Sequence, residues 1–238
     1  MKTVAVLAYH KIGEPSIDGW KTWNYISEAN FSNQLQYLQK NNWNVINAHT
    51  FIKNLQTPES LRSKSVLITF DDGYRSNLQI ALPILKKFLY PAIVFVPTSF
   101  VGNYNAFDAD IFYEPREEIC TWEELKELEQ NNISIESHGL NHRHFSKMSI
   151  SEQTDEISKS KEIIELNLKK KVNLFSFPYG DNGGDPFIMQ SILQDAKYKA
   201  AFLYGGGPVE FPIKDKFQLA RVAVGSDTDL NNELEKYA

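Results

Sequence analysis

Short runs of apolar residues, rich in β-branched and aromatic side chains, recur along the whole chain. Between them lie stretches in which apolar residues return every three or four positions. The first pattern is typical of buried strands and the second of amphipathic helices, so their alternation predicts βα units and a mostly parallel sheet. The expected strands are 4–9, 43–46, 66–70, 92–96, 133–136, 172–177, 200–203 and 219–224.

Four of the intervening stretches carry helix signals. Thr121 with Glu124 and Ser149 with Glu152 each match a capping box, in which a hydroxyl and a later glutamate bond each other's backbone N–H groups. Of the other two helices, one is indicated by apolar spacing and one by a proline at its first position. The expected helices are 30–39, 122 to about 129, one that opens after 149, and 186–196.

About seven or eight such units in 238 residues favour a closed or nearly closed barrel, with an open doubly wound sheet as the alternative. Nothing in the sequence resembles a linker between two cores, so residues 1–238 are expected to form a single α/β domain. Both architectures place their chemistry at the carboxyl ends of strands.

Composition and charge narrow the class of protein. A hydrophobic fraction of 42% is ordinary for a globular enzyme, and a net charge of -5 argues against nucleic acid as a partner. The single cysteine, Cys120, cannot form an intramolecular disulfide and is expected to serve packing. We find no run long enough for a membrane span or a secretory signal, so we expect a cytoplasmic protein, with export as the alternative if a leader precedes this sequence.

Polar residues follow the ends of several predicted strands, and in a barrel these positions meet on one face. Asp71 and Asp72 come together after 66–70, and Gly73 then allows a tight turn. An ordinary Asp-Gly turn after a buried strand is the alternative interpretation of this segment.

His138 and His142 follow the strand 133–136 and are four residues apart, a spacing that brings two imidazoles to one ion if the segment is a turn of helix. Two histidines and one carboxylate form a common facial set for Zn²⁺, Fe²⁺ or Co²⁺. His144 is a spare candidate, and two exposed loop histidines are the alternative. His49 has the position of an ordinary residue at a helix start.

Phe177 to Gly180, which follow another strand, form a rigid aromatic turn that can aim a backbone N–H into a site and line it with the Tyr179 ring. A purely structural turn explains the composition equally well. Together with 69–73 and 137–142, in this order, the turn resembles the motifs of the polysaccharide deacetylase family, also called the NodB homology domain or carbohydrate esterase family 4. The resemblance extends from Tyr9 to about Val224.

The resemblance implies a distorted (β/α)7-type barrel and a hydrolase that removes N-acetyl groups from an amino sugar. It implies that Asp72, His138 and His142 hold a divalent metal, most often zinc, with Co²⁺, Ni²⁺ or Fe²⁺ as alternatives. The metal would polarise water and the acetamide carbonyl, Asp71 would act as general base, and the backbone N–H of Tyr179 would stabilise the oxyanion.

The sequence departs from the family pattern at two places. Many members have an arginine where Ser176 stands here, and many carry a general-acid histidine on the last strand, which here reads Arg221-Val-Ala-Val. A subset similar to the poly-N-acetylglucosamine deacetylases begins with a Tyr-His pair, which Tyr9 and His10 match. The resemblance therefore assigns His10 as general acid, and Arg221 has a strand position from which it could replace the missing arginine.

The expected substrate is a carbohydrate: an N-acetylglucosamine-type glycan or its lipid- or nucleotide-linked precursor. The loop 98–120 is the expected specificity element. Two alternatives remain open: a metal amidase or esterase that acts on another amide or an O-acetyl glycan, and a catalytically silent glycan-binding protein. Aromatic residues that could stack on sugar rings are Trp20, Trp23, Tyr25, Tyr104, Phe107, Phe112, Tyr113 and Tyr204.

Overall fold

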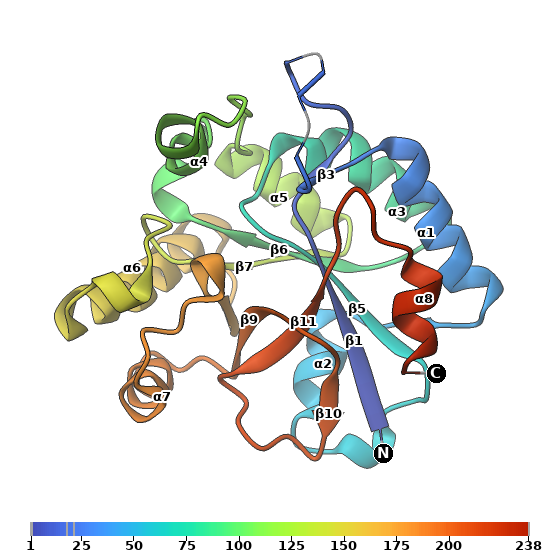
Figure 1. Cartoon of the computed structure of the whole chain (residues 1–238). Helices are drawn as coiled ribbons and strands as arrows, with labels where there is room; N and C mark the ends of the chain where they lie inside the picture. Colours follow the sequence, from blue (N-terminus) through green and yellow to red (C-terminus); the bar gives the residue numbers. More distant parts are fainter. Residues whose placement is uncertain (1, 18, 21, 238) are drawn as a thin grey trace.

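A computed structural model describes residues 2–17, 19–20 and 22–237 (Figure 1). Parallel strands close into a seven-stranded barrel because β1 pairs with β5 on one side and with β11 on the other. The closed ring confirms the predicted barrel and rules out the open sheet. In order around the barrel the strands are β1 (Lys2–Tyr9), β5 (Ser65–Phe70), β6 (Ala92–Val96), β7 (Ile133–Ser137), β8 (Leu174–Ser176), β9 (Ala200–Gly206) and β11 (Leu219–Ala223).

Among the described residues, four short strands lie outside this ring. The expected strand at 43–46 is reduced to β4 (Asn44–Val45), which pairs with β5. The sequence did not predict β10 (Val209–Phe211), which runs antiparallel to the start of β1, or the small pair β2 (Lys11–Ile12) and β3 (Tyr25–Ile26). Segments of two or three residues are too short for a recognisable apolar alternation.

Helices surround the barrel (Figure 1). All four predicted helices form, and both predicted capping boxes are present. The other four helices have six or seven residues each, which is too short for a clear helical period. The helices are α1 (Glu28–Lys40), α2 (Ala48–Asn54), α3 (Leu82–Phe88, after a π-helical turn at Asn77–Ala81), α4 (Ala106–Phe112), α5 (Trp122–Gln130), α6 (Ile150–Leu168), α7 (Pro186–Asp195) and α8 (Leu230–Glu235).

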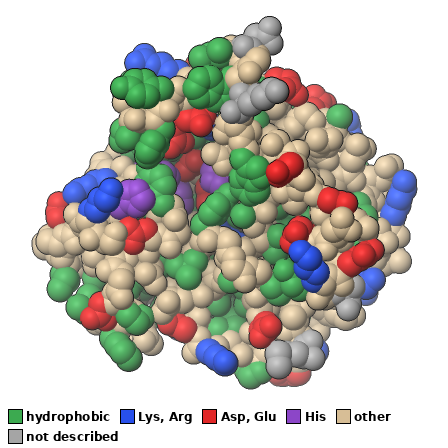
Figure 2. Space-filling model, viewed as in Figure 1, with side chains coloured by type: hydrophobic (Ala, Val, Ile, Leu, Met, Phe, Trp, Pro, Cys, Tyr) green, Lys and Arg blue, Asp and Glu red, His purple; other side chains and the backbone are tan. Residues whose placement is uncertain are grey.

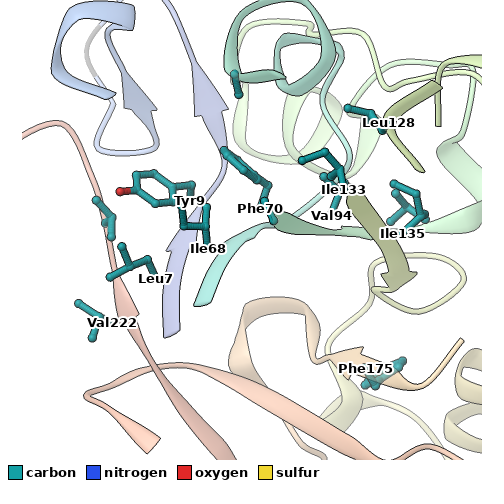
Figure 3. Packing of buried hydrophobic residues seen from close by; sticks show 14 of the residues in the cluster. Leu7, Tyr9, Ile68, Phe70, Val94, Leu128, Ile133, Ile135, Phe175 and Val222 are labelled. Carbon is teal, nitrogen blue, oxygen red and sulfur yellow. The ribbon is translucent and has the colours of Figure 1, made fainter. Parts of the chain in front are cut away.

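In most barrel strands alternate residues belong to two different apolar clusters, because successive strand side chains point to opposite faces. Leu7 and Tyr9 belong to the cluster that packs against the surrounding helices (Figure 3). Val4 belongs to the second cluster, in which the Phe51 ring of α2 lies 5.5 Å from the ring of Phe202. In the part of the chain that the structure describes, no helix is both long and apolar enough to span a membrane.

Candidate active site

One cavity, of about 260 Å³, collects the polar residues that follow the strand ends. All six residues that the sequence analysis assigned to catalysis or metal binding line it, although they come from four separate segments of the chain. Figure 2 shows histidine and carboxylate side chains gathered in a hollow of this face. The predicted convergence is therefore confirmed. The lining residues are His10, Asn24, Asp71, Asp72, Asp108, His138, His142, Phe177, Tyr179 and Tyr204.

Asp71 forms a buried, two-pronged ion pair with Arg221 of β11. The two distances are 2.8 Å from Nη1 to Oδ1 and 2.6 Å from Nη2 to Oδ2. Asp71 is 2% exposed and Arg221 is 0% exposed. Burial by itself raises the pKa of the Asp71 carboxyl, but Arg221, with smaller contributions from nearby histidines, outweighs burial and lowers it. Asp71 is thus held as a carboxylate inside the protein.

The remaining donors of Arg221 are also used. Nε donates to the carbonyl of Leu203 at 2.7 Å, Nη1 to Thr69 Oγ1 at 3.2 Å, and Nη2 to Ser176 Oγ at 2.9 Å. With the two bonds to Asp71, all five N–H groups of the guanidinium have acceptors. Ser176, which stands where many family members have arginine, therefore leaves space for an arginine from another strand and binds it.

The strand-end turn that carries Asp72 requires a left-handed backbone. Asp72 and Gly73 have φ values of 72° and 70°. A Cβ at Gly73 would lie 2.7 Å from a methyl carbon of Val96, so only glycine fits there without displacing β6. The turn separates the two carboxylates: the side chain of Asp71 meets Arg221, and that of Asp72 meets the histidines.

Asp72, His138 and His142 offer three ligand atoms that lie within 4.8 Å of one another. Oδ1 of Asp72 is 3.5 Å from Nε2 of His138 and 3.1 Å from Nε2 of His142. This Oδ1 is buried and has no hydrogen-bond partner among the described residues. A buried acceptor without a donor is unfavourable unless a cation or a donor completes its surroundings.

The protonation state of His138 leaves one ring nitrogen free to bind a cation beside Asp72. Its Nδ1 lies 2.7 Å from the carbonyl oxygen of Ser176, so Nδ1 carries a proton and donates it. Burial is the main reason that the pKa of His138 is lowered to about 4, which keeps the ring neutral. The lone pair of Nε2 then faces the carboxylate of Asp72. Three converging electron-pair donors, one of them oriented by a backbone carbonyl, fit a divalent metal ion.

His142 reaches the cluster by a route that the sequence analysis did not anticipate. The turn of helix that the spacing of the two histidines would allow does not form, because residues 138–142 form a loop. Gly139 and His142 have φ values of 82° and 50°, which no α-helix contains. For His142, burial lowers the pKa, but the neighbouring carboxylate of Asp72 more than offsets this and raises it.

Tyr179 lies in a short 3-10 turn (Pro178–Gly180) with a left-handed φ of 59°. The hydrogen bonds of this turn come from the N–H groups of Gly180 and Asp181, so the turn itself does not use the N–H of Tyr179. The ring of Tyr179 packs edge-on against His142 and stacks on His144 at 4.0 Å. His144 is outside the ligand cluster; its Nδ1 lies 3.4 Å from Asp181 instead.

His10 lines the cavity beside Tyr204, with ring centroids 5.4 Å apart and nearly perpendicular planes. Its Nδ1 is buried and lacks a hydrogen-bond partner among the described residues. The structure thus brings His10 into the same cavity as Asp71. Its role as general acid stays a prediction. His49 lies at the start of α2, as expected, and does not line the cavity.

Sequence reasoning missed two lining residues, Asn24 and Asp108, because neither follows a barrel strand. Asp108 lies on α4, where its Oδ2 accepts a hydrogen bond from Tyr74 at 3.1 Å. The preceding Phe107 stacks on His142 with a centroid distance of 4.1 Å. The loop 98–120, expected to be a specificity element, therefore does form part of the cavity wall.

Most of the aromatic candidates lie away from this cavity. Only Tyr204 of that set lines it, whereas Phe107 packs behind a histidine. Tyr25 is buried and donates to Glu117, and Phe112 and Tyr113 are exposed at the end of α4. Contact of any of them with a sugar stays a prediction.

Comparisons find known proteins that are similar to this chain. YxkH of Bacillus subtilis (strain 168), whose name describes it as a polysaccharide deacetylase, is 28% identical over 65% of this chain. The match spans about half (51%) of the length of that relative. A Staphylococcus aureus (strain MRSA252) poly-β-1,6-N-acetyl-D-glucosamine N-deacetylase is 26% identical over 86% of the chain and 69% of its own length. The Streptococcus pyogenes deacetylase PplD, solved with acetate, has a TM-score of 0.83 at 21% identity, with 99% of this chain and 98% of that one covered.

The PplD likeness establishes the shared fold. The sequence model of the polysaccharide deacetylases matches residues 59–202, which include both aspartates, both histidines and the Tyr179 turn. This match covers more than half of the chain and confirms the resemblance of its motifs. The chain belongs to the polysaccharide deacetylase family.

Proposed function

We propose that the protein is a divalent-metal-dependent hydrolase that removes N-acetyl groups from an amino sugar. The substrate would be an N-acetylglucosamine-type glycan or its lipid- or nucleotide-linked precursor. The observation that carries the proposal is the contrast between two adjacent aspartates. Asp71 is paired with Arg221, whereas Asp72 faces two imidazoles, so one can act as a base while the other binds a cation. The name of the Staphylococcus aureus relative supports the N-acetyl sugar.

Asp72, His138 and His142 would hold the ion, for which zinc suits one carboxylate and two imidazoles. When bound, such an ion supplies a Lewis acid that polarises water and the acetamide carbonyl. Asp71 remains a carboxylate beside Arg221. It can therefore accept a proton from the attacking water as the water oxygen bonds to the carbonyl carbon.

The N–H of Tyr179 would donate a hydrogen bond to the oxyanion that forms at the former carbonyl oxygen. When this intermediate collapses, the carbon–nitrogen bond breaks and its electron pair goes to nitrogen. His10 would donate a proton to that nitrogen, so acetate and a free amino sugar leave. The shared cavity of His10 and Asp71 supports this division between acid and base.

The decisive experiment measures acetate release from chitooligosaccharides and from a nucleotide-linked N-acetylglucosamine. Chelated protein would be assayed with and without added Zn²⁺ or Co²⁺, beside an O-acetyl glycan and a small cyclic amide. Metal-dependent release from an N-acetyl sugar supports the proposal. Turnover of only the other two substrates, or none by protein with bound Zn²⁺, would contradict it in favour of another hydrolase or a glycan-binding protein.

A further inference from the structure

The loop between the two histidines of the ligand cluster wraps around a buried glutamate from α6. Oε2 of Glu156 accepts hydrogen bonds from the backbone N–H groups of Leu140 and Asn141, both at 2.8 Å. Its Oε1 accepts a third bond, from Nδ2 of Asn141, also at 2.8 Å. Glu156 is only 2% exposed, and hydrogen bonds to a carboxylate are among the stronger ones in proteins.

The opposite side of the loop is bonded to the segment that follows β6. The carbonyls of Gly139 and Leu140 accept from the N–H groups of Thr98 at 3.1 Å and Ser99 at 2.9 Å. Ser99 Oγ donates to Oδ1 of Asn141 at 2.9 Å. Since the loop is not helical, these contacts with other elements, rather than its own turns, satisfy its backbone and fix its shape.

A glycine follows His138 because the loop passes so close to the carboxylate. A Cβ at position 139 would lie 3.2 Å from Oε2 of Glu156, and the backbone there has a φ of 82°. The position of the Glu156 carboxylate therefore depends on a glycine at position 139. Glu156 contacts the loop backbone and the Asn141 side chain and makes no hydrogen bond with either imidazole.

We propose that Glu156 is the positioning residue of the metal centre. It holds the loop so that His138 and His142 already face Asp72 before an ion binds. A loop that is ordered in advance loses less conformational entropy on binding, so the affinity for the ion increases. This inference rests on the proposed function, because it takes Asp72, His138 and His142 as the ligands.

The chain offers a matched control in Glu136 of β7. Glu136 is also 2% exposed, and its Oε2 accepts two backbone N–H groups, from Asn173 at 2.7 Å and Leu174 at 2.8 Å. Those groups lie at the start of β8 and not in the histidine loop. Loss of either glutamate leaves two backbone N–H groups without their acceptor, but only Glu156 bonds the loop that carries the histidines.

The experiment titrates the full chain with Zn²⁺ against a chromophoric chelator. Glu156→Ala should bind Zn²⁺ about 10- to 100-fold more weakly than the wild type, the range typical of lost outer-shell contacts. Glu156→Gln should lose less, because its one oxygen can still accept both backbone N–H groups. Glu136→Ala should keep the wild-type affinity although its thermal stability falls. Asn141→Ala removes the side-chain bonds to Glu156 and Ser99 but keeps both backbone N–H bonds to Glu156, so it should show a smaller loss than Glu156→Ala.

Amide hydrogen exchange of metal-free protein gives a readout independent of the ion: Leu140 and Asn141 should exchange faster in Glu156→Gln than in the wild type. If Glu156→Ala does not fold, Glu156→Gln and Asn141→Ala decide. Unchanged Zn²⁺ affinity in the folded Glu156 variants, or an equal loss in Glu136→Ala, would overturn the inference. Failure of the wild-type chain to bind Zn²⁺ would instead contradict the proposed function, and the inference with it.

Discussion

Two neighbouring residues of one strand end, Asp71 and Asp72, have opposite surroundings. Both oxygens of Asp71 accept hydrogen bonds from Arg221, whose donors are all used. Oδ1 of Asp72 faces two imidazoles and has no hydrogen-bond partner among the described residues. The hydrogen-bonding capacity of Asp71 is met by Arg221, whereas the buried Oδ1 of Asp72 is open to a cation. The difference teaches that the surroundings, rather than the residue type, distinguish the two aspartates, and it is the basis of their proposed roles as base and ligand.

The largest expected effect comes from removal of the proposed base, Asp71. Asp71→Asn should lower kcat for acetate release by about 10²- to 10⁴-fold, because an amide cannot accept the water proton. Zn²⁺ binding should persist, since Asp71 is outside the ligand cluster. Acetate assays and metal analysis of the same sample would test both statements. Full activity in this variant would contradict the proposed role of Asp71 as general base.

The next largest effect is expected when one of the proposed metal ligands beside Asp72 is removed. His138→Ala should lose bound metal, and its turnover should fall with it, because two ligands hold a divalent ion poorly. Equilibrium dialysis with Zn²⁺, beside His144→Ala as the control, would measure the effect. Equal losses in both variants would contradict the assignment of His138 as a ligand and His144 as a neighbour.

Removal of the buried guanidinium of Arg221 should shift the pH dependence of kcat/KM. Arg221 outweighs burial and lowers the pKa of Asp71, so in the wild type the carboxylate and the stability it provides are lost only as the pH falls through that lowered value. In Arg221→Met the effect of burial remains and the pKa rises. The acid limb of kcat/KM should move to higher pH, and the folded state should lose about 3–5 kcal/mol at neutral pH.

The pH–rate profile and urea unfolding of Arg221→Met would be compared with those of Arg75→Met. Arg75 pairs with Glu118 and Glu124 near the surface, so its loss should move neither the acid limb nor the stability by much. An unchanged acid limb in Arg221→Met would show that the ion pair does not set the protonation of Asp71.

The smallest effect is expected at Ser176. Ser176→Ala removes one acceptor from Arg221 and leaves both bonds to Asp71 in place. The free energy of unfolding should fall by about 1 kcal/mol, and kcat should change only a few-fold. Urea unfolding and acetate assays would measure these changes. A loss as large as that of Arg221→Met would mean that the serine, rather than the ion pair, orients the base.

The helix starts and the barrel strands were predictable because local pattern decides them. The capping boxes at Thr121 and Ser149 form as expected, since each involves residues only three positions apart. The loop between His138 and His142 was not predictable in the same way. Its spacing permits a helical turn, but the carboxylate of Glu156 and the segment after β6 hold it in another shape.

The sequence by itself determined the strand and helix order, the placement of polar residues after strand ends, and hence the convergence of His10, Asp71, Asp72, His138 and Tyr179. The sequence proposed Arg221 as a replacement for the arginine missing at Ser176, but only the tertiary structure decided that Arg221, 150 residues beyond Asp71, pairs with it, and that Asp108 enters the cavity wall. The physical reason is that buried charges must find partners wherever the closed barrel brings them. Such pairings depend on non-local packing and leave no periodic signal in the chain.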